Sequence, residues 1–161
     1  MTWVRVVALI GAVALAVSAL AGPALAACRD DQVELRTVAG GVMRFSVEVA
    51  RTADEQARGL MFRESMARSA GMIFVYPSPR RASFWMKNTL IPLDMVFAGP
   101  DGVVRHVHPD ARPRDETPID GGEGVLVVLE INGGLAARLG ITPGAVMRHP
   151  AFAAAAVWPC D

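Results

Sequence analysis

The sequence lacks both a surplus of charge and any run of basic residues. Its 161 residues include 16 Lys and Arg and 16 Asp and Glu, so the formal net charge is +0 at pH 7. Proteins that bind nucleic acids contact the phosphates through clustered Lys or Arg side chains. The composition therefore argues against a nucleic-acid partner.

Motifs of several enzyme classes are missing as well. The two cysteines form no Cys-x-x-Cys motif, which argues against a thiol–disulfide exchange site. No serine lies in a Gly-x-Ser-x-Gly setting, and the glycine-rich residues 121–124 lack the lysine and the following helix of a phosphate-binding loop. These patterns predict no cofactor.

Long hydrophobic runs are absent beyond the first 26 residues, which have the three parts of a secretory signal peptide. Arg5 supplies the positive start, residues 6–20 form the apolar run, and Ala24-Leu25-Ala26 has the pattern that signal peptidase cleaves. The run is shorter than the roughly 20 residues that span a bilayer. We therefore expect a signal peptide over residues 1–26 and an exported protein, periplasmic or secreted, with no membrane span in its mature form.

Only two cysteines are present, one near each end of the expected mature chain. In an oxidising compartment, Cys28 and Cys160 are expected to form a disulfide that closes nearly the whole domain. An alternative remains open, because Leu25-Ala26-Ala27-Cys28 also has the form of a lipoprotein processing site. In that case Cys28 would carry a lipid anchor.

Hydrophobic patterning after the leader predicts many short strands and little helix. Residues 42–50 alternate apolar and polar side chains, which is typical of a half-buried strand. Thr52 and Glu55 form a capping box, so a short helix should begin at Ala53, and residues 134–139 favour a further helical turn. Residues 77–79 are expected to form a turn and residues 108–124 a long surface loop. The other predicted strands are residues 33–38, 72–76, 82–86, 93–98, 103–107, 125–131 and 145–148.

This pattern predicts a mainly β fold. Residues 27–161 are expected to form a single domain, a compact β sandwich or barrel with one or two short helices. No internal repeat or low-complexity segment marks a second domain.

Several segments together resemble a known family, the uncharacterised family catalogued as domain of unknown function 192. The resemblance covers roughly residues 33–148 and implies a small β-rich domain, often exported in bacteria, for which no activity is established. The segments are EQARGLMFRES at 55–65, GMIFVY at 71–76, FWMKNTLIPLDMVF at 84–97, VLEINGG at 128–134 and LGITPG at 139–144.

Polar side chains between an aromatic pair and an apolar strand form the leading candidate for a binding site. A lysine, an amide and a hydroxyl beside a tryptophan could bind a carboxylate, a phosphate or sugar hydroxyls. The hypothesis is an exported protein that binds a small polar or anionic ligand, a glycan or an envelope fragment. Alternatively, Lys87 pairs with Asp94 in a structural network, and one of Arg58 and Arg63, which form a second polar cluster, pairs with Glu55 or Glu64. The expected site residues are Arg63, Trp85, Lys87, Asn88, Thr89 and Asp94.

Other functions remain alternatives. Asp94 and Glu130 would be the acid and base of a hydrolase if they lay about 5–10 Å apart on one cleft. An envelope accessory protein that acts through protein contacts is a third hypothesis. Metal binding is not expected, and the candidates for it would be His106 and His108, which face the same way on a strand, with His149 as a third ligand.

Overall fold

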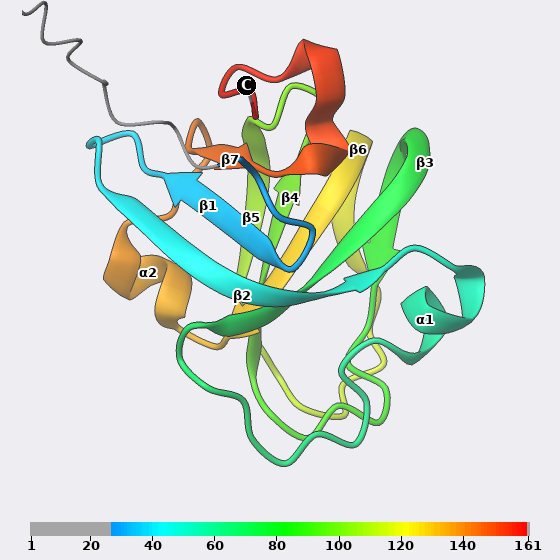
Figure 1. The fold of residues 1–161 in the computed structure, drawn as a ribbon. Helices are drawn as coiled ribbons and strands as arrows, with labels where there is room; N and C mark the ends of the chain where they lie inside the picture. The colour runs from blue at the N-terminus through cyan, green and yellow to red at the C-terminus, as the bar shows by residue number, and fades with distance from the viewer. Residues whose placement is uncertain (1–26, 161) are drawn as a thin grey trace, which may run out of the picture.

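The computed structural model describes residues 27–160, so the predicted signal peptide lies outside the described residues. Within these residues, seven strands, two short α-helices and one 3-10 helix follow one another (Figure 1). Their order is β1 (Gln32–Arg36), β2 (Val42–Ala50), α1 (Ala53–Arg58), β3 (Ala70–Phe84), β4 (Leu93–Ala98), β5 (Val104–Ala111), β6 (Ile119–Asn132), α2 (Leu135–Leu139), β7 (Val146–Arg148) and the 3-10 helix η1 (Pro150–Ala155).

The strands form one curled sheet in the order β5-β4-β6-β3-β2-β1-β7. Strands β2 and β3 pair in parallel across the connection that contains α1, and the other pairs are antiparallel. The two edges of the sheet meet where Val103 bridges to Val146 and the N–H of Val104 donates to the carbonyl of Ala145 at 2.8 Å. The prediction of a mainly β domain with a barrel-like sheet is therefore confirmed.

The predicted capping box forms and begins α1 at Ala53. The Thr52 hydroxyl accepts a 3.3 Å hydrogen bond from the Glu55 N–H, and the Glu55 carboxylate accepts one of 2.9 Å from the Thr52 N–H. The helix ends after six residues, where Gly59 takes a φ of 47° that favours glycine. A Cβ at Gly59 would lie 3.2 Å from the ring of Phe74, so the chain leaving α1 passes close over β3.

Two sequence-based expectations are wrong. Residues 77–79 form no turn but belong to β3, which runs for 15 residues. The register of β3 against β6 shifts between Val75 and Arg80, and prolines are tolerated at such bulges because the ladder hydrogen bonds are already interrupted. Residues 108–124 form no long loop either, since β5 continues to Ala111 and β6 begins at Ile119.

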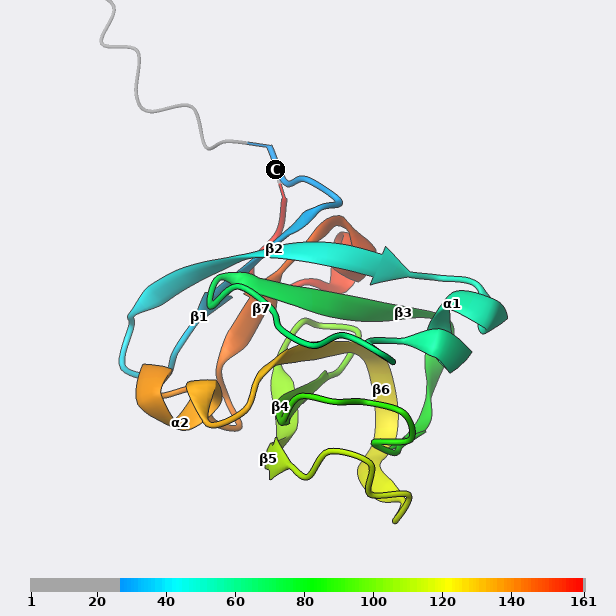
Figure 2. The same cartoon turned by 90° about the horizontal axis from the view of Figure 1, so that it is seen from below.

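The bends of β3 and β6 divide the buried side chains into two clusters. One lies inside the curled sheet and includes Val33 and Phe152 from opposite ends of the described chain. The other includes Phe74 and Phe97, with Phe84 packed edge-on between their rings at 5.0 and 5.8 Å. The loops after α1, β3 and β5 gather at one end of the sheet, opposite the end where the C-terminus lies (Figure 1). The helices α1 and α2 lie on opposite sides of the molecule (Figure 2).

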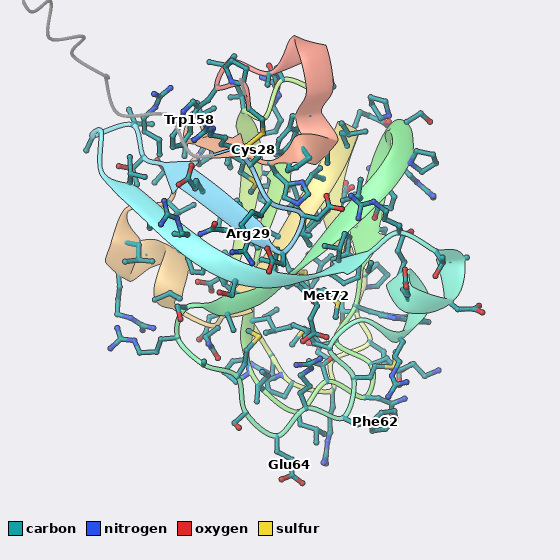
Figure 3. The ribbon with its side chains drawn as sticks, in the orientation of Figure 1. Cys28, Arg29, Phe62, Glu64, Met72 and Trp158 are labelled. Atoms are coloured by element: carbon teal, nitrogen blue, oxygen red, sulfur yellow. A yellow bond between two sulfur atoms is a disulfide. The ribbon has the colours of Figure 1, made fainter. Side chains whose placement is uncertain are left out.

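A disulfide joins the two ends of the described chain, which confirms that prediction. Cys28 and Cys160 are 132 residues apart, and their Cα atoms lie 5.3 Å apart. The sulfur that acylation of Cys28 would modify is thus part of this bond. Trp158 lies at the same end of the molecule (Figure 3), where the guanidinium of Arg36 is 4.7 Å from its ring centroid. Among residues 27–160, no helix is both long and apolar enough to cross a membrane.

Candidate functional site

Glu130 is a buried carboxyl group in the middle of the sheet. Its strand, β6, lies between β3 and β4, so Glu130 pairs with Met72 on one side and Met95 on the other. Only 4% of the residue is exposed. Burial between these side chains raises the pKa of Glu130 to about 8, so the carboxyl group is protonated at neutral pH. Within residues 27–160 it has no hydrogen-bond or ion-pair partner.

The Glu130 side chain opens on a cavity of about 360 Å³, which we call the Glu130 cavity. Helix α1 and the residues after it form one wall, and the bent strand β3 with the start of the next loop forms the other. This volume is typical of sites for small molecules. The lining residues are Gln56, Ala57, Arg58, Gly59, Leu60, Met61, Phe74, Tyr76, Arg80, Arg81, Ser83, Phe84, Trp85, Lys87, Thr89 and Glu130.

The Glu130 cavity has more positive than negative charge. Arg58, Arg80 and Lys87 line it, and none of these three takes part in an ion pair within the described part of the chain. Arg81 also lines the cavity, but its charge is neutralised because its guanidinium pairs with Asp120 at 2.6 Å and with Glu123 at 3.3 Å. A protonated Glu130 adds no negative charge, so the cavity favours an anion.

Aromatic rings hold two of these cations in place. The guanidinium of Arg80 lies 5.2 Å from the ring centroid of Tyr76, and the ammonium of Lys87 lies 5.2 Å from that of Trp85. Burial raises the pKa of the Tyr76 hydroxyl above its ordinary value, with a smaller contribution from the nearby Glu130. Two of the three unpaired cations that line the cavity therefore lie near aromatic rings.

The structure brings together only some of the residues predicted from the sequence. Trp85, Lys87 and Thr89 line the Glu130 cavity. Asn88 is exposed and lies beside the cavity without lining it, and its carbonyl accepts a 2.9 Å hydrogen bond from the Phe62 N–H. Arg63 also does not line the cavity. It pairs with Glu48, and not with either of the two glutamates considered from the sequence.

Asp94 does not belong to the cavity, which corrects the expected site. It is fully buried, and its carboxylate accepts hydrogen bonds from the backbone N–H groups of Asp110, Gly134 and Ala136 at 2.7, 2.8 and 2.6 Å. The expected pair with Lys87 does not form, because Lys87 lies over Trp85. Asp94 holds the end of β5 and the start of α2 against β4.

The two carboxylates expected for hydrolysis are not placed on one cleft. Met95 pairs directly with Glu130, and side chains alternate along a strand, so Asp94 points to the opposite face of the sheet from Glu130. Asp94 faces the first helical turn of α2, whereas Glu130 faces the cavity beside α1. An acid and base that act on one glycosidic bond must open on the same cleft.

The histidines are also dispersed. The ring of His106, on β5, stacks on that of Phe97, on β4, with their centroids 5.6 Å apart. His149 is buried elsewhere, with its Nε2 2.9 Å from the carbonyl of Asp30 and its Nδ1 accepting from the Ala151 N–H. His149 therefore does not join His106 and His108. No group of three or more His, Cys, Asp or Glu side chains within residues 27–160 is placed to hold a metal ion.

Sequence reasoning missed Tyr76 and Arg80 as parts of the site, and it considered Arg58 only in a separate polar cluster with Arg63. The segment of residues 77–79 was expected to turn the chain, and a turn would have carried Arg80 away from Tyr76. Arg58 had a signal, since the capping box places it in the last turn of a short helix. Its position at the Glu130 cavity follows only from the packing of the α1 segment close to β3.

Comparisons with other proteins agree with the fold. The family model that matches residues 35–149 is that of DUF192, described as "Uncharacterized ACR". A crystal structure of a protein of unknown function from Novosphingobium aromaticivorans DSM 12444 is 49% identical, with a TM-score of 0.70, and the match covers 72% of this chain and 82% of that one. A crystal structure from Sinorhizobium meliloti 1021, provisionally described as a transcription regulator, is 40% identical, with a TM-score of 0.72 and coverage of 75% and 94%. No curated protein matches.

Proposed function

We propose that this chain, which belongs to the DUF192 family of uncharacterised proteins, binds a small anionic ligand in the Glu130 cavity. The ligand class that fits best is an acidic sugar or another acidic fragment of the cell envelope. The proposal keeps Trp85, Lys87 and Thr89 from the site expected on the sequence. It leaves out Arg63, Asn88 and Asp94, and it adds Glu130, Arg58 and Arg80.

One observation carries the proposal. A carboxyl group that is 4% exposed has no partner among residues 27–160 and opens on a cavity lined by three cations that have no ion-pair partner there. No fully buried side-chain nitrogen or oxygen among the described residues lacks a hydrogen-bond partner, so the unpartnered oxygens of Glu130 are accessible from the cavity. A bound ligand can therefore form the hydrogen bonds that no protein group forms with this carboxyl group.

The protonation state of Glu130 defines the ligand further. A protonated carboxyl group donates one hydrogen bond, so the inner end of the ligand should carry an acceptor such as a hydroxyl or carboxylate oxygen. The guanidinium groups of Arg58 and Arg80 suit carboxylates and phosphates, with which they form charge-assisted hydrogen bonds. The ammonium of Lys87 provides a further positive charge.

We also propose that the protein acts after export, in the periplasm or outside the cell. The Cys28–Cys160 disulfide supports this location, because such bonds persist mainly in oxidising compartments. The signal peptide expected over residues 1–26 supports it as well. Acidic sugars and acidic envelope fragments are available there.

Isothermal titration calorimetry of the oxidised protein tests the proposal. The probes are galacturonate, N-acetylmuramate and phosphate, with galactose and N-acetylglucosamine as uncharged counterparts. At least one acid should bind, and its uncharged counterpart should bind at least tenfold more weakly. The substitutions Arg58→Ala and Lys87→Ala should each lower the affinity for that acid about tenfold, the equivalent of about 1.4 kcal/mol.

Arg112→Ala is the matched control, because Arg112 is an exposed cation that does not line the cavity. A short DNA duplex is included because one similar structure is described as a transcription regulator. The proposal is wrong if no acid binds, or if Arg112→Ala weakens binding as much as Lys87→Ala does. In that case the hypothesis of an envelope accessory protein that acts through protein contacts would replace the ligand-binding proposal.

A further inference from the structure

A second cavity adjoins the first. It has a volume of about 500 Å³, and we call it the Phe62 cavity. Arg58, Gly59 and Met61 line both cavities, so the segment after α1 forms the wall between them. The other residues that line the Phe62 cavity are Glu48, Val49, Ala50, Glu55, Phe62, Arg63 and Met72.

Phe62 is held in an unusual position. Its side chain is 64% exposed, and its backbone has a φ of +63°, a conformation that bulky side chains rarely adopt. The Phe62 N–H donates a 2.9 Å hydrogen bond to the carbonyl of Asn88, which itself has a φ of +55°. Figure 3 shows Phe62 at the end of the molecule opposite Cys28 and Trp158. Neither this exposure nor this backbone conformation stabilises the fold, and such features concentrate at functional sites.

The two cavities differ in charge. In the Phe62 cavity, Arg63 is paired with Glu48, and the Glu55 carboxylate accepts backbone N–H groups at the start of α1. The one cation there without an ion-pair partner among residues 27–160 is Arg58, at the wall that both cavities share. The Phe62 cavity therefore suits an uncharged or weakly charged group with an apolar face that can lie on an aromatic ring.

From these features we propose that the ligand is an acidic oligosaccharide of at least two sugar units. Its acidic unit lies in the Glu130 cavity, and the next unit lies in the Phe62 cavity against the ring of Phe62. Arg58 contacts the link between the two units. A sugar ring has a face of C–H groups that packs on an aromatic side chain, while its hydroxyls remain available to Glu48 and Arg63 at the other edge. This inference rests on the proposed function, because the acidic unit occupies that site.

Comparison of galacturonate with its dimer and trimer tests the inference, again by calorimetry on the oxidised protein. The dimer should bind about tenfold more tightly than the monomer, the equivalent of about 1.4 kcal/mol, because its second unit adds contact with the ring of Phe62. In Phe62→Ala the affinity for the monomer should stay within twofold of the wild-type value. The dimer should then bind no more tightly than the monomer.

Val42→Ala is the control, because Val42 is also an exposed hydrophobic residue and lies on β2 away from both cavities. A thermal melt of Phe62→Ala checks its fold, and its Tm should not fall because Phe62 is 64% exposed and alanine keeps the same backbone conformation. If the monomer binds and the dimer binds equally well, the inference is wrong and the proposed function stands. If neither galacturonate nor its dimer binds while N-acetylmuramate or phosphate does, the inference is wrong for this sugar and the proposed function stands; if none of these acids binds, the proposed function itself fails.

Discussion

The Oδ2 atom of Asp94 accepts a 2.6 Å hydrogen bond from the backbone N–H of Ala136, 42 residues further along the chain. The same carboxylate also accepts from Gly134, so a single side chain on β4 satisfies two backbone donors at the start of α2. A helix of five residues has no stability in isolation. Asp94 therefore determines where α2 begins, which explains a fully buried carboxylate outside the candidate site.

We predict that Asp94→Ala destabilises the protein without affecting the ligand site directly. Three backbone N–H groups would lose their acceptor, so the free energy of unfolding should fall by about 3 kcal/mol or more. Urea denaturation measures this change, with Asp54→Ala, an exposed residue of α1, as the control. A stable Asp94→Ala protein that no longer binds acids would contradict the structural role.

Glu130 should make the stability of the protein depend on pH. Its pKa is about 8 in the folded state and near 4.5 in the unfolded state, so between these values the folded protein holds a proton that the unfolded chain releases. The contribution of Glu130 to the free energy of unfolding is therefore greatest below pH 4.5. It falls by about 1.4 kcal/mol per pH unit as the pH rises, until about pH 8.

Glu130→Gln removes this dependence, because glutamine has nearly the same shape and does not titrate. The variant should be more stable than the wild type by about 3 kcal/mol at pH 7, and the difference should disappear near pH 4.5. Urea denaturation at a series of pH values measures both proteins. A constant difference across this range would show that Glu130 ionises normally in the folded state.

His149 should have the opposite effect at acidic pH. Burial, and to a smaller degree the positive charge of Arg51, lower its pKa below the ordinary 6.5. Below pH 6.5 the unfolded chain takes up a proton that the folded protein does not accept, so stability falls as the pH falls. Protonation would also remove the acceptor of the Ala151 N–H.

His149→Gln provides the comparison for this prediction. The amide of glutamine offers one donor and one acceptor at all pH values, so it replaces both polar functions of the neutral ring. Glu130 changes the stability of both proteins equally between pH 8 and pH 5, so the difference between them isolates His149. In thermal melts at these two pH values, chosen on either side of 6.5, the Tm of the wild type relative to that of the variant should be lower at pH 5 than at pH 8. An unchanged difference in Tm would mean that His149 takes up its proton in the folded state.

The disulfide should contribute a large part of the stability. Closing a loop of 132 residues restricts the unfolded chain, and the chain-entropy relation gives a stabilisation of about 5 kcal/mol. Reduction, or the double substitution Cys28→Ser and Cys160→Ser, should therefore lower the midpoint of urea denaturation. Intact mass of the exported protein identifies the state of Cys28, because a lipid would add mass whereas a disulfide removes two hydrogen atoms. An acylated Cys28 would overturn this prediction.

Local patterns in the sequence were sufficient for several elements. The alternation over Val42–Ala50 gave the bounds of β2, and the side chains of Thr52 and Glu55 gave the first residue of α1. The presence of only two cysteines left one possible disulfide. The sequence segments around Trp85 and Lys87 identified the family and part of the cavity.

Other features depended on contacts between distant residues. The prolines near Val75 suggested a turn, but pairing with β6 on both sides of the bulge keeps β3 a single bent strand. That bend carries Arg80 to the cavity. Asp94 and Glu130 looked equivalent as isolated acidic residues in apolar segments, and only the register of β4 against β6 places them on opposite faces.

By itself, then, the sequence determined most of the strand segments, the capped start of α1, the family and the single possible disulfide. Each of these depends on residues close in the chain or on composition. Tertiary structure alone decided that the Glu130 carboxyl group is buried at a cavity, and that Arg58, Arg80 and Lys87 line the same cavity. The reason is physical: strand register and the packing of α1 on β3 arise from contacts between residues far apart in sequence, and a shift of one residue would turn Glu130 to the other face.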